Sequence, residues 1–289
     1  MQRRDFIRQS ALLTAGAFAL SQTELLANAP AKTISPFGVQ LYSVRDVIGK
    51  DPKGVMTQLA QMGYKQFESY SGQQGFLWGM TPAEMKSFLN GIGVKMVSTH
   101  FNFGQQMDKP DELQKSFDMA KGAGLTYILC PYIGPQKSMD DWKRIADRFN
   151  KAGEQAKKSG MKFGYHNHDY SFKPLDGQIP QEYLLANTDP KNVMFELDLC
   201  WIDVAGQDTE AHLKKYGKRY ELCHIKDYKK VDGKPVQNDL GKGAVDFKKT
   251  LRVAMENGMK YYIVEQEEYP ADVLTSMKND AEYMKTLSV

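Results

Sequence analysis

The segment MKFGYHNHDY, residues 161–170, is an apolar, strand-like run that ends in two histidines. It is the clearest example of the pattern from which the fold is predicted. Side chains alternate along a strand, so His166 and His168 share one face and Asn167 lies on the other. Similar runs recur along the chain and also end in histidine, aspartate or glutamate, the residue types that commonly bind metals in proteins. They are KMVSTH ending at His100, VMFELD ending at Asp198, YELCHIKD around His224, and YYIVE ending at Glu265. A parallel α/β barrel collects its active-site groups at such strand ends.

Apolar runs alternate with segments of helical periodicity from Ser35 onward. Strands are predicted near 37–42, 65–69, 95–100, 125–130, 161–166, 193–198, 220–226 and 260–265. Helices are predicted near 52–62, 82–92, 110–123, 139–159, 180–187, 208–216, 246–257 and 270–286. Strand–helix units of this number and total length predict a (β/α)8 TIM barrel forming a single domain over residues 30–289. The alternative is a doubly wound open sheet. It is disfavoured because SVRDVIGKD follows the first strand where a glycine-rich phosphate loop belongs.

Residues 1–29 have the order of an export signal. Arg3 and Arg4 precede an apolar run over 11–20, and Ala27-Asn28-Ala29 resembles a cleavage site. The paired arginines indicate the twin-arginine pathway and therefore a periplasmic protein. The apolar run is too short to span a bilayer comfortably, so no stable membrane anchor is expected. An ordinary N-terminal helix or a lipid-facing anchor is the alternative interpretation.

The composition argues against several other classes of protein. Of the 289 residues, 42% are hydrophobic and 25% are charged, as in soluble globular domains. The net charge is only +3 and the 38 basic residues are scattered, so no nucleic-acid surface is predicted. The three cysteines, Cys130, Cys200 and Cys223, all fall in apolar runs and predict burial without a disulfide framework.

Four ligand-type residues fall at the ends of four consecutive predicted strands. They are His166, Asp198, His224 and Glu265, separated by about one strand–helix unit each. A histidine at one strand end is more often a hydrogen-bonded structural residue, and an aspartate there often caps the next helix. All four together favour a site for one divalent metal ion.

The chain resembles the xylose isomerase-like TIM-barrel superfamily of sugar isomerases, epimerases and inosose-dehydratase-like proteins. The resemblance covers nearly all of residues 30–289. It depends on the segments GVQLYSVRD, GYHNHDYSF, FELDLCW, HIKDY, LGKGAVDF and IVEQEE. It implies His166, Asp198, His224 and Glu265 as the metal ligands.

One position departs from the epimerases of this superfamily, which usually carry a glutamate where His166 stands. A mechanism with two opposed glutamates is therefore disfavoured, and the sequence is closer to the inosose-dehydratase-like branch. Two nitrogen and two oxygen ligands favour Mn²⁺, with Co²⁺, Fe²⁺, Zn²⁺ and Mg²⁺ as alternatives.

Further residues are predicted to act near the ion. Glu265 is the candidate general base, and Lys226 or His168 would return the proton. The alternatives are a surface ion pair with Asp227 for Lys226 and a purely structural role for His168. The predicted substrate-binding residues are His100, Glu68, Gln40, Trp201 and Lys226.

The expected function is a metal-dependent sugar isomerase or epimerase that acts on a keto-sugar or related polyol through a metal-bound enediolate. The alternative is a dehydratase or β-eliminating lyase on a keto-sugar, keto-glycoside or inosose, which shares the first proton abstraction. A non-catalytic sugar-binding barrel that keeps the metal is the second alternative. A repair nuclease of the same superfamily is disfavoured by the five histidines and weak net charge. The expected partner is a small carbohydrate, and the sequence leaves a homo-oligomer open.

Overall fold

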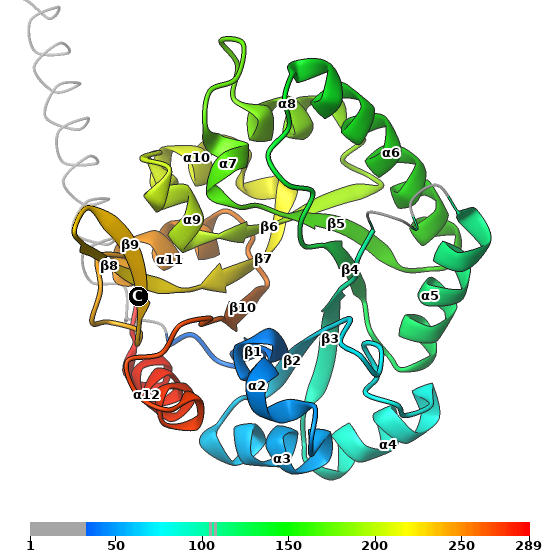
Figure 1. Cartoon of the computed structure of the whole chain (residues 1–289), viewed down its shortest axis with the longest axis vertical. Coiled ribbons are helices and arrows are strands. Elements are labelled where there is room, and N and C mark those ends of the chain that lie inside the picture. Colours follow the sequence, from blue (N-terminus) through cyan, green and yellow to red (C-terminus); the bar gives the residue numbers. More distant parts are fainter. Residues whose placement is uncertain (1–32, 104–105, 107–108) are drawn as a thin grey trace, which may run out of the picture.

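The computed structural model describes residues 33–289 except residues 104–105 and 107–108, so the predicted export segment lies outside it. Eight parallel strands close into a barrel in the order β1-β10-β7-β6-β5-β4-β3-β2, and helices surround them (Figure 1). The predicted TIM barrel is therefore confirmed. The strands are β1 Gly38–Gln40, β2 Gln66–Tyr70, β3 Lys95–His100, β4 Tyr127–Cys130, β5 Lys162–His166, β6 Val193–Asp198, β7 Tyr220–Ile225 and β10 Tyr261–Val264.

Several helices begin after a residue whose side chain accepts a hydrogen bond from a backbone N–H of the first turn. Thr81 and Glu84 form a capping box at the start of one helix, and Ser138 and Asp141 form another. Asp246 accepts a hydrogen bond from the Lys249 backbone N–H and caps the helix that follows it. The longer helices are α3 Pro52–Met62, α4 Pro82–Gly91, α5 Pro110–Gly122, α6 Met139–Lys158, α8 Pro180–Asn187, α10 Thr209–Tyr216, α11 Phe247–Glu256 and α12 Val273–Thr286. Short helical segments are η1 Leu41–Val44, α2 Arg45–Ile48, α7 Asp169–Phe172, α9 Leu199–Val204 and η2 Gly217–Arg219.

The barrel interior changes from apolar to polar along the strands. Tyr127, Leu129, Met194 and Leu222 form one buried apolar cluster. Alternate residues further along β6 and β7 are Glu196, Asp198 and His224, and all three are fully buried. The polar groups therefore gather toward the carboxyl ends of the strands, where TIM barrels carry their active sites.

Gly164 in β5 is required by the narrow interior. A Cβ atom there would lie 2.2 Å from Sδ of Met194 and 2.7 Å from Cδ2 of Leu129. The glycine in GYHNH thus lets the barrel close below His166.

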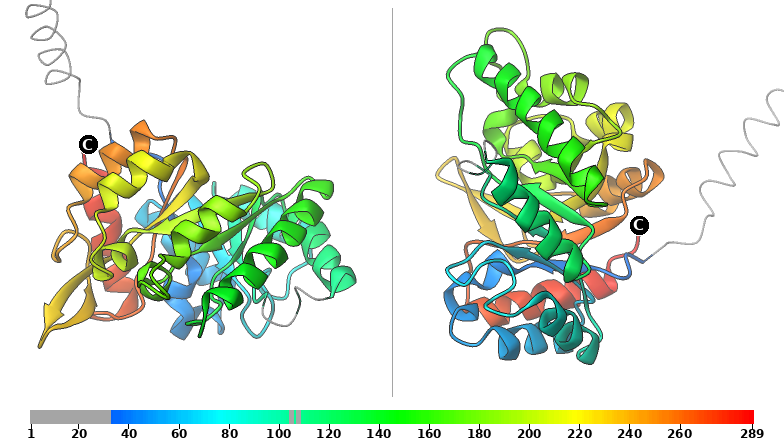
Figure 2. Two further views of the ribbon diagram at one scale, coloured as in Figure 1. Left: turned by 90° about the horizontal axis from the view of Figure 1, so that it is seen from above. Right: turned by 90° about the vertical axis from the view of Figure 1, so that its right-hand side faces the viewer.

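An antiparallel hairpin after β7 is absent from the eight predicted units. It consists of β8 Asp227–Val231 and β9 Lys234–Asn238, and it projects away from the barrel (Figure 2). Asp232 and Gly233 at its tip both have positive φ, 50° and 78°. An Asp-Gly pair is the usual two-residue turn of such a hairpin, so the sequence did carry a signal for it. No helix among the described residues is long and apolar enough to cross a membrane.

Candidate active site

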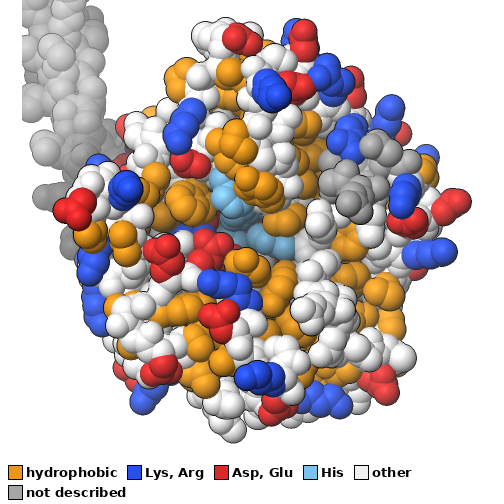
Figure 3. All heavy atoms as spheres, viewed as in Figure 1, with side chains coloured by type: hydrophobic (Ala, Val, Ile, Leu, Met, Phe, Trp, Pro, Cys, Tyr) orange, Lys and Arg blue, Asp and Glu red, His pale blue; other side chains and the backbone are white. Residues whose placement is uncertain are grey.

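A cavity of about 430 Å³ opens at the carboxyl ends of the barrel strands. Figure 3 shows histidine side chains at the bottom of the hollow in the centre of this face. The cavity is lined by three histidines, two glutamates and three tyrosines, among other residues: His100, His166, His168, Glu265, Glu267, Tyr42, Tyr70 and Tyr132.

The four predicted metal ligands lie together, with His166 and Glu265 lining this cavity and Asp198 and His224 buried beside them. One donor atom from each of His166, Asp198, His224 and Glu265 lies within 4.8 Å of the others. The Nδ1 atom of His224 is 3.1 Å from Nε2 of His166 and 2.9 Å from Oε2 of Glu265. Nε2 of His166 is 3.5 Å from Oδ2 of Asp198. All four side chains are buried, so their donor atoms face one another in a place largely shielded from water.

The Asp198 carboxylate has one oxygen committed to the fold and one left for a ligand. Its Oδ1 atom accepts hydrogen bonds from the backbone N–H groups of Cys200 and Trp201 and so caps α9. Its Oδ2 atom is buried and faces the nitrogens of other side chains, with Nζ of Lys226 3.2 Å away and Nε2 of His166 3.5 Å away. The predicted ligand role and the predicted capping role are therefore compatible, and Oδ2 is the oxygen that would bind a metal ion.

Lys226 lies among the same carboxylates. Its Nζ atom is 2.7 Å from Oε2 of Glu265, 3.2 Å from Oδ2 of Asp198 and 3.4 Å from Oε2 of Glu267. Burial opposes the charge, but these carboxylates outweigh it and raise the pKa of Lys226 well above its usual range. In turn, Lys226 and His224 outweigh the burial of Glu265 and hold the pKa of that carboxyl well below its usual range. The alternative pairing of Lys226 with Asp227 is not found, because Asp227 accepts hydrogen bonds from Gly241, Gly243 and Val245 instead.

The two histidines of GYHNH are held neutral. Burial, with the nearby charge of His224, lowers the pKa of His166 to about 4. Burial also lowers the pKa of His168 to about 3, with smaller contributions from His166 and Lys226. The His168 ring is stacked with Tyr170 and with Trp201, at interplanar angles of 8° and 25°. His168 can therefore accept a hydrogen bond from a substrate but is a weak base.

The predicted substrate-binding residues lie at different depths. His100 lines the cavity, whereas Glu68 and Gln40 are fully buried and hydrogen-bonded to each other at 2.7 Å. The Trp201 ring lies 5.2 Å from Nζ of Lys226, and its buried Nε1 atom has no hydrogen-bond partner among the described residues. Contact with a substrate stays a prediction for each of these residues.

Sequence reasoning did not assign roles to several residues of the site. Tyr70 and Tyr132 line the cavity from strand ends and loops, where no spacing distinguishes them from core aromatics. Glu196 lies two residues before Asp198 and therefore on the same face of β6, but the strand pattern does not show that it meets Glu68, His100 and His224. Glu267 lines the cavity and accepts a 2.8 Å hydrogen bond from Gln237 of the unforeseen hairpin.

Comparisons with known proteins agree with this architecture. The sequence model of the xylose isomerase-like TIM barrel matches residues 56–287. An inosose dehydratase of Clostridium perfringens is 28% identical over 207 residues, which is 65% of this chain and 63% of that protein. An inosose dehydratase of Lacticaseibacillus casei is 27% identical over 249 residues, covering 74% of this chain and 81% of that protein. The crystal structure of a sugar phosphate isomerase/epimerase from Parabacteroides distasonis is 27% identical with a TM-score of 0.74, covering 86% of this chain and 92% of that one.

Proposed function

Because the chain belongs to the xylose isomerase-like TIM barrel family, we propose that it is an enzyme that removes a proton from the carbon beside a carbonyl group of an uncharged keto-sugar or keto-cyclitol. One observation carries the proposal. Two imidazoles and two carboxylates converge at the buried base of an open cavity, with the Lys226 ammonium beside them. A lone structural histidine or ion pair does not require such a convergence.

The residues that would hold a divalent ion are His166, Asp198, His224 and Glu265. When bound, the ion supplies positive charge beside a carbonyl oxygen, which makes a proton on the next carbon easier to remove. The mixed nitrogen and oxygen donor set favours Mn²⁺, with Co²⁺, Fe²⁺, Zn²⁺ and Mg²⁺ as alternatives.

Glu265 is the proposed base. It lines the cavity and is ionised at neutral pH, as a base must be, although the low pKa that Lys226 and His224 cause also weakens it as a base. Lys226 is the proposed acid, because its Nζ atom carries protons and lies 2.7 Å from Glu265.

Elimination is the outcome that this pair of groups supports best. As the proton leaves for Glu265, its electrons form a carbon–carbon double bond and the β carbon–oxygen bond breaks. Lys226 then protonates the departing oxygen, which leaves as water or an alcohol. The similarity to two inosose dehydratases supports this dehydratase or lyase function.

The second candidate is an isomerase or epimerase, in which Lys226 returns the proton to carbon. The similarity to the Parabacteroides protein favours that candidate.

The cavity favours a substrate without phosphate groups. Among the described residues, its lining includes Glu265 and Glu267 but neither lysine nor arginine, and the nearby Lys226 ammonium is already paired with three carboxylates. Phosphate binding normally uses such cations. The tyrosines Tyr42, Tyr70 and Tyr132 offer flat faces and hydroxyl groups that suit a sugar ring.

Proton exchange tests this proposal. The protein, saturated with Mn²⁺, would be incubated in D₂O with a panel of keto-sugars and inososes, with mass spectrometry of substrate and product. We expect deuterium beside the carbonyl, or an unsaturated product that has lost a substituent. Glu265→Gln should lower the rate by about 10²–10⁴-fold, whereas the exposed Glu256→Gln should not change it. Equal rates in Glu265→Gln and wild type would remove Glu265 from the role of base.

A further inference from the structure

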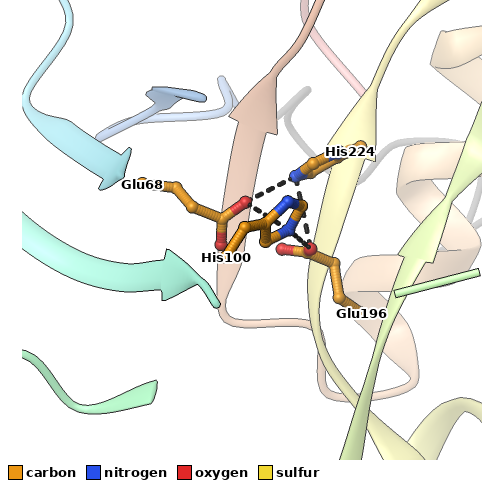
Figure 4. Close-up of side chains that lie close together, drawn as sticks. All are labelled: Glu68, His100, Glu196 and His224. Carbon is orange, nitrogen blue, oxygen red and sulfur yellow. Dashed lines mark hydrogen bonds and ion pairs between the residues drawn. The ribbon is translucent and has the colours of Figure 1, made fainter. Parts of the chain in front are cut away.

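Three buried side chains surround the second ring nitrogen of His224, on the side away from the proposed metal ligands. We call Glu68, His100 and Glu196 the lower cluster (Figure 4). The Nε2 atom of His224 lies 2.7 Å from Oε1 of Glu68 and 3.3 Å from Oε2 of Glu196. Its Nδ1 atom faces His166 and Glu265 instead. The two nitrogens of one ring therefore face two different groups.

Glu68 is held firmly in this arrangement. Its Oε1 atom accepts a 2.7 Å hydrogen bond from the Gln40 side-chain amide, and its Oε2 atom accepts a 2.5 Å bond from the Ser98 hydroxyl. His100 lies between the two carboxylates, with Nε2 3.0 Å from Glu68 and 2.8 Å from Glu196. Glu68, Glu196, Gln40 and Ser98 all have no solvent exposure. A carboxylate fixed by so many donors sets the position of the ring it contacts.

The contact also gives His224 a partner for one ring proton when its other nitrogen binds a metal. Both ring nitrogens face carboxylates, with Nε2 2.7 Å from Glu68 and Nδ1 2.9 Å from Glu265. A metal ion at Nδ1 would need the lone pair there, which leaves the N–H group on Nε2 to donate to Glu68. Metal-binding histidines commonly donate their other N–H to a carboxylate in this way. We infer that Glu68 is a positioning residue that orients His224 for metal binding through Nδ1, an inference that rests on the proposed function.

The total charge of the buried groups is consistent with one divalent ion bound at the four proposed ligands and none in the lower cluster. Four buried carboxylates belong to the two groups, and Lys226 supplies one positive charge. A divalent ion at Nδ1 and a positive His100 between Glu68 and Glu196 would bring this buried region to neutrality. Buried charges need such compensation.

A second ion in the lower cluster is the competing interpretation. Glu68, His100, Glu196 and His224 could each offer one donor atom, and within the described part of the chain Oε1 of Glu196 has no hydrogen-bond partner. However, His224 would then have to lose both ring protons and bridge two ions. The short hydrogen bonds already made to Glu68 favour the positioning role.

Metal titration separates these interpretations. Purified protein stripped of metal would be titrated with Mn²⁺, with free Mn²⁺ measured by electron paramagnetic resonance and bound metal by elemental analysis. We expect one ion per chain in the wild type and a dissociation constant raised about 10–100-fold in Glu68→Gln. Ser98→Ala, which removes one donor to Glu68, should give a smaller increase in the same direction. Glu256→Gln is the control and should bind as the wild type does.

Thermal unfolding of the metal-free variants controls for a purely structural role, which would lower the melting temperature without changing the Mn²⁺ dissociation constant of the folded protein. If both Glu68→Gln and Ser98→Ala bind Mn²⁺ with wild-type affinity, the inference is overturned. Two ions per wild-type chain, with one lost in Glu68→Gln, would also overturn it and assign a second metal site. A wild-type protein that binds no divalent ion would overturn the proposed function, and the inference with it.

Discussion

Lys226 places a buried positive charge directly beside the proposed metal ligands. A buried ammonium touches two proposed metal ligands, and its third carboxylate partner, Glu267, also lines the cavity. The positive charge works against a second cation nearby while it supplies a proton donor. Metal binding and catalysis should therefore respond in opposite directions when this charge is removed.

Replacing Lys226 by glutamine tests this separation. We expect Mn²⁺ affinity to stay equal or to increase, because a like charge leaves the ligands. Turnover at saturating Mn²⁺ should fall by about 10²–10⁴-fold, as is typical for loss of a general acid. Steady-state kinetics and metal titration measure the two effects, with exposed Lys230→Gln as the matched control. Wild-type turnover in Lys226→Gln would assign the lysine a structural role only.

The sequence predicted which four side chains meet at the strand ends, but it did not predict how deep in the barrel each acidic side chain lies. Strand ends and side-chain parity brought His166, Asp198, His224 and Glu265 to one place, because a barrel leaves them little alternative. The same parity could not separate Glu196 from Asp198, two residues apart on one strand. Their depth depends on how neighbouring strands are staggered, and that stagger is a property of the closed sheet.

At the level of elements, the helices and barrel strands were predictable and the hairpin was missed. Helix ends can be predicted because their capping residues are adjacent in the sequence. Examples are Asp246 at the start of α11 and Gly63 after α3. The β8–β9 hairpin interrupts a strand–helix unit, and the expectation of a regular repeat obscured its Asp232-Gly233 turn. Its contribution to the cavity through Gln237 depends on tertiary contacts alone.

Helix α12 carries a buried acid that makes stability depend on pH. Burial raises the pKa of Asp280 to about 8, although Oδ1 accepts a 2.8 Å hydrogen bond from the Leu240 N–H. Between the unfolded pKa of about 4 and this value, the native state holds a proton that the unfolded chain lacks. Stability should therefore fall as pH rises through that window, by at most about 1.4 kcal/mol per pH unit.

Asp280→Asn should remove this dependence. Asparagine keeps the acceptor for Leu240 and cannot ionise, so the variant should exceed the wild type in stability by more at pH 8.5 than at pH 5. Urea unfolding at both pH values measures the difference, and exposed Asp232→Asn in the hairpin turn is the control. A difference that does not grow with pH would show that Asp280 is ionised in the native protein.

At the scale of the whole molecule, residues 1–29 are predicted to direct export of a folded barrel. The prediction depends on Arg3 and Arg4 ahead of an apolar run. Replacing both arginines by lysine should leave the protein in the cytoplasm, whereas Arg8→Lys should not. Cell fractionation with immunoblotting measures the distribution. Normal export of the doubly substituted protein would contradict a twin-arginine signal.

Closure of the barrel by β1 and β10 also bears on how the protein is made. Gly38 near the start of the described chain pairs with Ile263 near its end, and the proposed ligand Glu265 follows directly after β10. During synthesis, the other seven barrel strands leave the ribosome before this last ligand emerges. A nascent chain that has not yet exposed β10 therefore cannot form the four-ligand site, and the ion can be loaded there only after that point.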